Sequence, residues 1–108
     1  MADRGFLTLN ISTGLRVELI IVRGSRHARV VAAIDFKRHA KARFQRVASI
    51  VQDADRAPRI DDDGELWIGT AVLPGLSQAM RDEAVAFMEA HGITVERPDP
   101  VDSQAVPA

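Results

Sequence analysis

The feature that most constrains the fold is a pair of alternating apolar runs joined by a short connection. Residues 6–11 read FLTLNI and residues 15–22 read LRVELIIV, so every second position in each run is apolar. A period of two places these side chains on one face of a β-strand, whereas an amphipathic helix needs a period near 3.6. Gly14, at the end of the connection, can adopt the positive φ of a tight turn. The sequence therefore predicts an antiparallel hairpin.

Residues 24–54 allow two interpretations, a strand followed by a helix or one long helix. A helix beginning near residue 24 would place Arg26 and Arg29 in its first turns, where the helix dipole disfavours cations. Two adjacent β-branched valines follow Arg29, and such residues favour a strand. We therefore expect a third strand over residues 29–34 and keep one helix over 24–54 as the alternative.

The apolar residues between positions 36 and 54 have the spacing of an amphipathic helix. Those within about 120° of a helical wheel are Phe36, Ala40, Phe44, Val47, Ile50, Val51 and Ala54. Asp35 precedes them, and an aspartate side chain can cap the first turn of a helix. We expect a helix over 36–54 that packs this stripe on the sheet, with the side-chain stem of Arg43 at its edge.

A second hairpin is predicted after this helix. Residues 61–64 (DDDG) have the composition of a hairpin loop, which would join a short strand at 59–60 to a buried strand at 65–73. Pro74 and Gly75 then break the strand, because proline lacks the backbone N–H that a central strand donates.

The last regular elements are a helix and a short strand. Residues 76–91 have an apolar stripe of helical spacing, with Ser77 suited to the N-cap and Gly92 to the C-terminal cap. Residues 93–97 (ITVER) predict a strand. Residues 98–108 contain closely spaced prolines and almost no large apolar residue, which predicts a flexible C-terminal tail.

Together these elements predict an α+β domain with a mainly antiparallel sheet and two helices on one face. The expected order is β-β-β-α-β-β-α-β, within a single domain of residues 1–97. If residues 24–54 form one helix, the order becomes a ferredoxin-like β-α-β-β-α-β with an extra N-terminal strand. A length of 108 residues suits one such domain.

The formal net charge of −1 conceals two strongly charged halves. Residues 1–46 contain ten Lys or Arg residues and three acidic residues, a net charge of +7. Residues 47–108 contain four Lys or Arg residues and twelve acidic residues, a net charge of −8. Such asymmetry indicates an anionic partner, oppositely charged faces that meet, or halves whose charges mix on the folded surface.

The basic half supplies the candidate binding residues. We expect Arg23, Arg26, Arg29, Lys37, Arg38, Lys41 and Arg46 to contact nucleic acid or an acidic protein surface. Because Phe36 and Phe44 are expected to face the core, contact with a groove or phosphate backbone is favoured over stacking of unpaired bases. The alternatives are a solvated helix face and an interaction module, including a homo-oligomer joined through opposite charges and a sheet edge.

A remote alternative arises from Asp35-Phe36-Lys37 after the apolar run VVAAI. This segment is similar to the acid-x-Lys half-motif of the PD-(D/E)xK nuclease superfamily. The resemblance implies a divalent metal held by carboxylates and a lysine that assists the attacking water. Glu18 would be the second carboxylate on a preceding strand. An ordinary N-cap role explains Asp35 without this chemistry.

Other catalytic and metal-binding motifs are lacking. The chain has no cysteine, its three histidines have no metal-ligand spacing, and no nucleotide-binding glycine pattern occurs. The acidic run 61–65 lacks the alternating ligands of an EF-hand loop. We therefore expect a non-enzymatic module with no catalytic residue, metal or cofactor. Without a signal peptide or a long apolar run, we expect a cytoplasmic protein that does not contact membranes.

Overall fold

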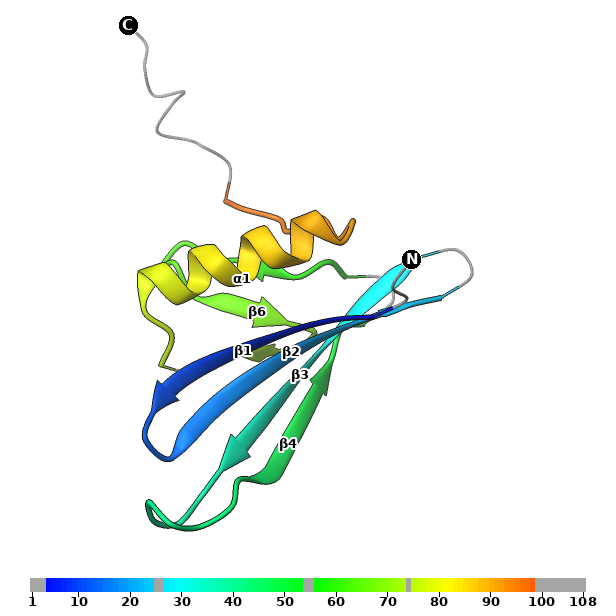
Figure 1. Ribbon diagram of the computed structural model, residues 1–108. Coiled ribbons are helices and arrows are strands. Elements are labelled where there is room, and N and C mark those ends of the chain that lie inside the picture. Colours follow the sequence, from blue (N-terminus) through cyan, green and yellow to red (C-terminus); the bar gives the residue numbers. More distant parts are fainter. Residues whose placement is uncertain (1–3, 25–26, 54–55, 74, 99–108) are drawn as a thin grey trace, which may run out of the picture.

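The described residues form a four-stranded sheet, a small three-stranded sheet and one helix packed over them (Figure 1). The computed structural model describes residues 4–24, 27–53, 56–73 and 75–98. The coarse α+β prediction is confirmed for these residues. The predicted order with two helices is wrong, since only one helix occurs in them, and neither of the two orders considered is observed.

The larger sheet is an antiparallel meander of four strands in chain order. Its strands are β1 (Arg4–Ser12), β2 (Leu15–Arg23), β3 (Ala28–Phe36) and β4 (Gln45–Val51). The predicted hairpin and the predicted third strand are confirmed, so the single long helix is excluded. β1 and β4 are the two edges.

One face of this sheet carries the core. Alternate residues of β2 are fully buried, as the period of two predicted. With residues of β1, β3, the small sheet, the helix and the segments before and after the helix, they form one cluster: Leu9, Val17, Leu19, Ile21, Val30, Ala32, Leu66, Ile68, Leu73, Leu76, Ala84, Val85, Met88, Ile93 and Val95. The opposite face of the sheet carries Phe6, which is 59% exposed.

The small sheet consists of β5 (Arg59–Ile60), β6 (Leu66–Ile68) and β7 (Ala71–Val72). The loop predicted between β5 and β6 is confirmed, but the single strand predicted over 65–73 is wrong. Gly69, with a φ of +59°, reverses the chain between β6 and β7. Glycine at the first position of a two-residue hairpin loop is the usual requirement of a type II′ turn.

The predicted C-terminal helix is confirmed as α1 (Gln78–Ala90). The Ser77 side chain accepts a hydrogen bond from the backbone N–H of Met80, as an N-cap does. Gly92 follows the C-cap with a φ of +84°, as predicted. Of the strand predicted at 93–97, the structure shows a single parallel bridge between Glu96 and Arg59.

The helix predicted over 36–54 is wrong. Residues 37–44 form a loop and residues 45–51 form β4, paired with β3. Asp35 therefore caps no helix, and Phe36 is 45% exposed. A bulge opposite Ile34 and Asp35 interrupts the ladder at Val47, which is 59% exposed. Residues 54–55 lie outside the described ranges.

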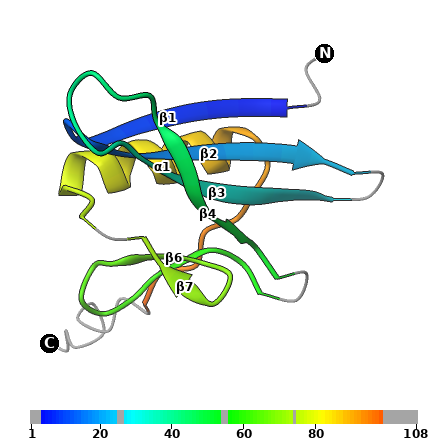
Figure 2. The same cartoon turned by 90° about the horizontal axis from the view of Figure 1, so that it is seen from below.

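The β3–β4 hairpin extends farther from α1 than any other part of the sheet (Figure 1). Figure 2, the view from below, shows β4 crossing obliquely in front of β2 and β3, which reflects the strong twist of the sheet. The predicted tail falls almost wholly outside the described residues, which end at Pro98. Within the described ranges, no helix has the length and apolarity of a membrane-spanning segment.

Candidate nucleic-acid interface

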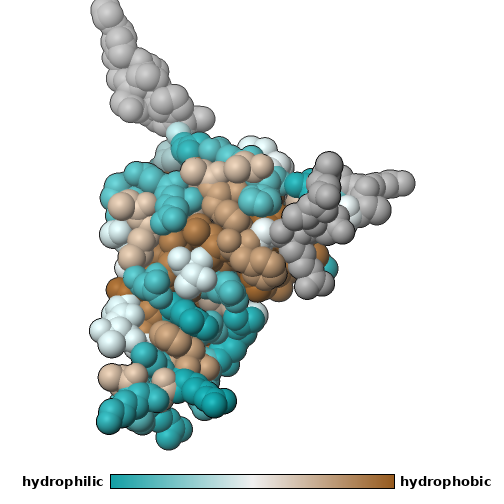
Figure 3. Space-filling view, in the orientation of Figure 1, coloured by the Kyte–Doolittle hydropathy of each residue, from teal (hydrophilic) through white to brown (hydrophobic). Residues whose placement is uncertain are grey.

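The strongest concentration of cations lies on the loop between β3 and β4, residues 37–44, called here the hairpin tip. It presents Lys37, Arg38, Lys41 and Arg43 within seven positions, and the last three are exposed. In the part of the chain that the structure describes, no carboxylate lies within ion-pair distance of these four side chains. Hydrophilic side chains cover this end of the molecule (Figure 3).

The base of the tip is held by a buried carboxylate between two arginines. Asp35 is 3% exposed and lies opposite Arg16 on β2 and Arg46 on β4. The Nε of each arginine donates to one oxygen of Asp35 at 3.0 Å. The hydrogen bond from Arg46 is the main cause that holds the pKa of Asp35 below its usual value, although burial opposes it.

Two cation–π contacts on Phe44 connect this base to the tip. The Arg16 guanidinium lies 4.1 Å from the centre of the Phe44 ring, and the Lys37 ammonium lies 4.9 Å from it. The backbone N–H of Lys37 donates to the carbonyl of Gly14 in the β1–β2 turn at 2.9 Å. The first residue of the tip, Lys37, and its last, Phe44, are therefore both held by contacts to other parts of the sheet.

Arg46 is also bound to Glu18, whose carboxylate accepts from its Nη2 at 2.6 Å. Arg16 and Arg46 thus have carboxylate partners, and their charges are largely neutralised. The cations of the tip itself have no such partners among the described residues. The positive charge that is not neutralised by a described carboxylate therefore lies at the tip and not at its base.

The seven predicted binding residues do not form one cluster. Lys37, Arg38 and Lys41 lie on the tip and Arg46 at its base. Arg29 lies on β3 eight residues before Lys37, which corresponds to about 26 Å along a strand.

Arg23 is used within the fold, because its Nη2 donates to the carbonyl of His91 at 2.7 Å and so caps the end of α1. Arg26 lies outside the described ranges.

Sequence reasoning missed three contributors to this site. Arg16 and Phe44 become neighbours only through the strand register, and Phe44 was expected in the core. Arg43 was expected to lie along the core but is exposed on the tip. For Arg43 the signal was present, because it stands within a dense run of cations.

The arrangement around Asp35 does not fit the metal centre that the nuclease resemblance implies. Both oxygens of Asp35 accept from guanidinium groups, and Arg46 lies between Asp35 and Glu18. The Lys37 ammonium lies over the Phe44 ring. Within the described residues there is no group of three or more His, Asp or Glu side chains that could hold a metal ion. We derive no metal-dependent step from these residues.

The acidic loop 61–65 is organised by Asp61. Its Oδ1 accepts the backbone N–H groups of Asp63 and Glu65 at 2.9 and 3.0 Å, and its Oδ2 accepts from Trp67 Nε1 at 2.8 Å. The Trp67 hydrogen bond is the main cause that lowers the pKa of Asp61. Its carboxylate therefore shapes the turn, as in other Asx turns.

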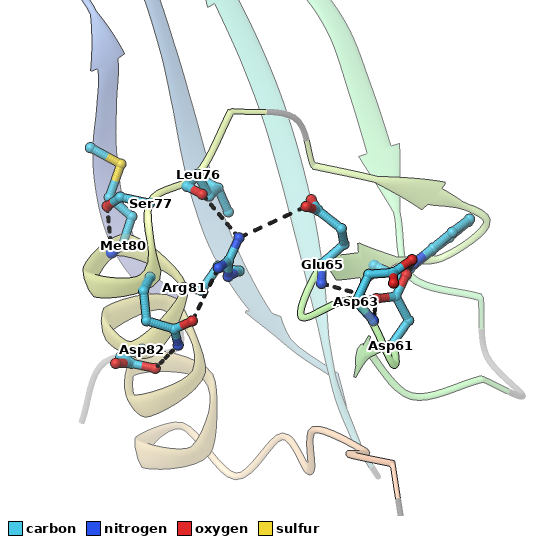
Figure 4. A network of polar contacts seen from close by, with 10 residues as sticks. Asp61, Asp63, Glu65, Leu76, Ser77, Met80, Arg81 and Asp82 are labelled. Carbon is cyan, nitrogen blue, oxygen red and sulfur yellow. Dashed lines mark hydrogen bonds and ion pairs between the residues drawn. The ribbon is translucent and has the colours of Figure 1, made fainter.

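Arg81 of α1 links the helix to this loop (Figure 4). Its Nη1 donates to the carbonyl of Leu76 at 3.1 Å and lies 3.9 Å from Glu65, while its Nη2 donates to Gln78 at 3.0 Å. The Nε of Arg81 is buried and has no hydrogen-bond partner within the described chain. This network positions the small sheet against α1.

We expect acidification to break the Asp61–Trp67 hydrogen bond and to shift the emission of Trp67, the only tryptophan of the chain. Because the folded-state pKa of Asp61 is lowered, the stabilisation is present above its unfolded value and is lost as pH falls through the folded value. Tryptophan fluorescence from neutral pH downwards measures this change. Asp61→Asn should show shifted emission already at neutral pH, whereas Asp62→Asn should behave as the unaltered chain; identical titrations of all three would contradict the assignment.

No family model matches the chain, and it has no significant match among curated proteins or solved structures.

Proposed function

We propose that this protein is a binding module whose hairpin tip contacts the phosphate backbone of double-stranded nucleic acid. The observation that carries the proposal is the set of four cations on the tip without carboxylate partners in the described structure. Cations concentrated on a projecting loop repel one another, and a polyanion relieves that repulsion while releasing its condensed counterions.

The shape of the hairpin favours a duplex over a single strand. A two-stranded β-ribbon fits the major groove of DNA, which is about 12 Å wide. Two cations of the same chain, Arg16 and Lys37, already lie over the Phe44 ring and compete with any base that would stack on it. The contact therefore depends on charge and shape and reads little sequence.

The test measures how binding to a mixed-sequence duplex of about 20 base pairs, two helical turns, depends on salt. Four phosphate contacts predict that the affinity falls about 150-fold between about 50 and about 200 mM salt. For Lys41→Ala combined with Arg43→Ala, two contacts remain and the fall is about 12-fold over the same range. Fluorescence anisotropy with a labelled duplex measures both slopes.

Arg29→Ala is the control, since it removes a cation from β3, the strand that leads into the tip, at a point about 26 Å from the tip. It should leave the salt slope unchanged. Equal losses for Arg29→Ala and the tip variants would contradict a site at the tip, and no binding at low salt would exclude nucleic acid. An acidic peptide that binds the tip more tightly than the duplex would support the acidic protein surface as the partner.

A further inference from the structure

The free edge of β1 is the second surface of this molecule without a partner among the described residues. β1 is an outer strand of the sheet in both ribbon views (Figures 1 and 2). Its inner edge pairs with β2 along its length. No backbone hydrogen bond to its outer edge occurs in the described ranges. An outer edge of this kind is a template for one more strand.

Natural edge strands are usually protected by charges, prolines or bulges, and β1 has little of this protection. From Gly5 to Ser12 the strand contains no charged residue and no proline, and its one irregularity falls at its end, between Asn10 and Ser12. The other edge, β4, carries Arg46 and the bulge at Val47. The two edges of the same sheet therefore differ in their ability to accept a partner.

An apolar seam runs beside the free edge of β1. Leu7 and Ile11 are partly buried at the margin of the core, as are Met80 and Phe87 of α1. Met80 and Phe87 are seven residues apart and so lie on one side of the helix.

That side of α1 faces β1. The centre of the Phe87 ring lies 4.7 Å from that of the His91 ring, and the His91 ring packs so closely on Gly5 of β1 that a Cβ there would collide with it. The space-filling view shows a hydrophobic region below α1, at the level of β1 (Figure 3).

We propose that a second copy of this chain occupies this edge, with β1 paired antiparallel to β1 of the partner about a two-fold axis at Thr8. This register places Leu7 opposite the partner's Leu9 on the core face. On the other face, Thr8 lies opposite the partner's Thr8 and Phe6 opposite the partner's Asn10. Thus no like charges are opposed from Gly5 to Ser12, and apolar and threonine pairs are favourable across strands.

The resulting dimer has one continuous sheet of eight strands with the two helices side by side on one face. It buries Met80 and Phe87 of both copies along the axis. A symmetric pairing of identical edges is self-complementary and closes after two copies, which explains why an unprotected edge need not lead to fibres. This surface is distinct from the hairpin tip and does not depend on nucleic-acid binding.

The full chain, free of nucleic acid, should sediment at twice the 11.8 kDa of one chain. Thr8→Lys places two lysines opposite one another at the axis, so the dissociation constant should rise about tenfold or more. Within one chain Thr8 lies opposite Glu18 on the exposed face, so a lysine there is compatible with the fold. Circular dichroism checks that the variant is folded.

Ser49→Lys is the matched control, because it adds the same charge to the exposed face of the other edge strand. It should leave the dimer intact. A monomeric unaltered chain at high micromolar concentration would overturn the proposal. It would equally be overturned if Ser49→Lys dissociated the dimer while a folded Thr8→Lys did not.

Discussion

Replacing Gly69 by alanine is expected to lower the free energy of unfolding by about 3 kcal/mol. The backbone at Gly69 has a φ of +59°, which costs a residue with a Cβ about 1–2 kcal/mol. The added Cβ would also collide with the carbonyl oxygen of Val51. That atom belongs to the backbone at the end of β4, so it cannot move as a side chain does, and overpacking costs about 1–3 kcal/mol.

Chemical denaturation followed by circular dichroism measures this loss. Gly64→Ala is the control, since Gly64 also has a positive φ, +84°, but a Cβ there meets nothing closer than an Arg81 nitrogen at 3.9 Å. It should cost about 1 kcal/mol, the conformational part alone. Equal losses at the two glycines would show that the close approach of the β6–β7 turn to β4 contributes nothing.

Replacing Asp35 by alanine is expected to lower the free energy of unfolding by about 2 kcal/mol. Breaking a buried ion pair costs about 3–5 kcal/mol when the remaining charge stays buried. Here the Arg16 and Arg46 side chains are 36% and 46% exposed, so water can solvate them and the expected loss is smaller. Glu18→Gln removes only the outer partner of Arg46 and should cost about 0.5 kcal/mol.

The same carboxylate predicts the direction of a pH dependence. The folded-state pKa of Asp35 is lowered, so its stabilisation is complete above the unfolded value, near 3.8, and is lost as pH falls through the folded value. Unfolding free energies measured from pH 6 downwards should therefore decline less steeply in Asp35→Ala than in the unaltered chain. Identical slopes would show that Asp35 does not carry this linkage.

The first hairpin could be predicted from the sequence because one face of its strands is buried. Val17, Leu19 and Ile21 alternate with more exposed residues. A strand shows an apolar residue at every second position only where burial also alternates along it. β4 differs, since six of its seven residues are exposed, so no alternation marks it. The helical spacing of its apolar residues was coincidental.

Two signals in the segment nevertheless favoured a strand. Lys37, Arg38 and Lys41 would have occupied the first turns of the predicted helix, where the dipole disfavours cations. The run from Val47 to Val51 is rich in β-branched residues, which favour strands. Gly69 likewise marked a turn inside the strand predicted over 65–73.

The candidate site could be predicted in part. A dense run of cations marked the segment that forms the tip, although that segment was predicted to be a helix and not a loop. Which cations are neutralised depends on register, because Asp35 meets Arg16 and Arg46 only when β2, β3 and β4 are aligned. The role of Arg23 at the end of α1 depends on a contact across 68 residues, which no local pattern records.

The placement of the core has a consequence for how this protein can change. Among the described residues, the buried apolar cluster has no member between Ala32 and Leu66, so the tip and β4 contribute almost nothing to it. The tip, residues 37–44, can therefore be altered in length or charge at small cost to the rest of the fold. A change confined to this loop could therefore alter the binding partner while the sheets and α1 stay the same.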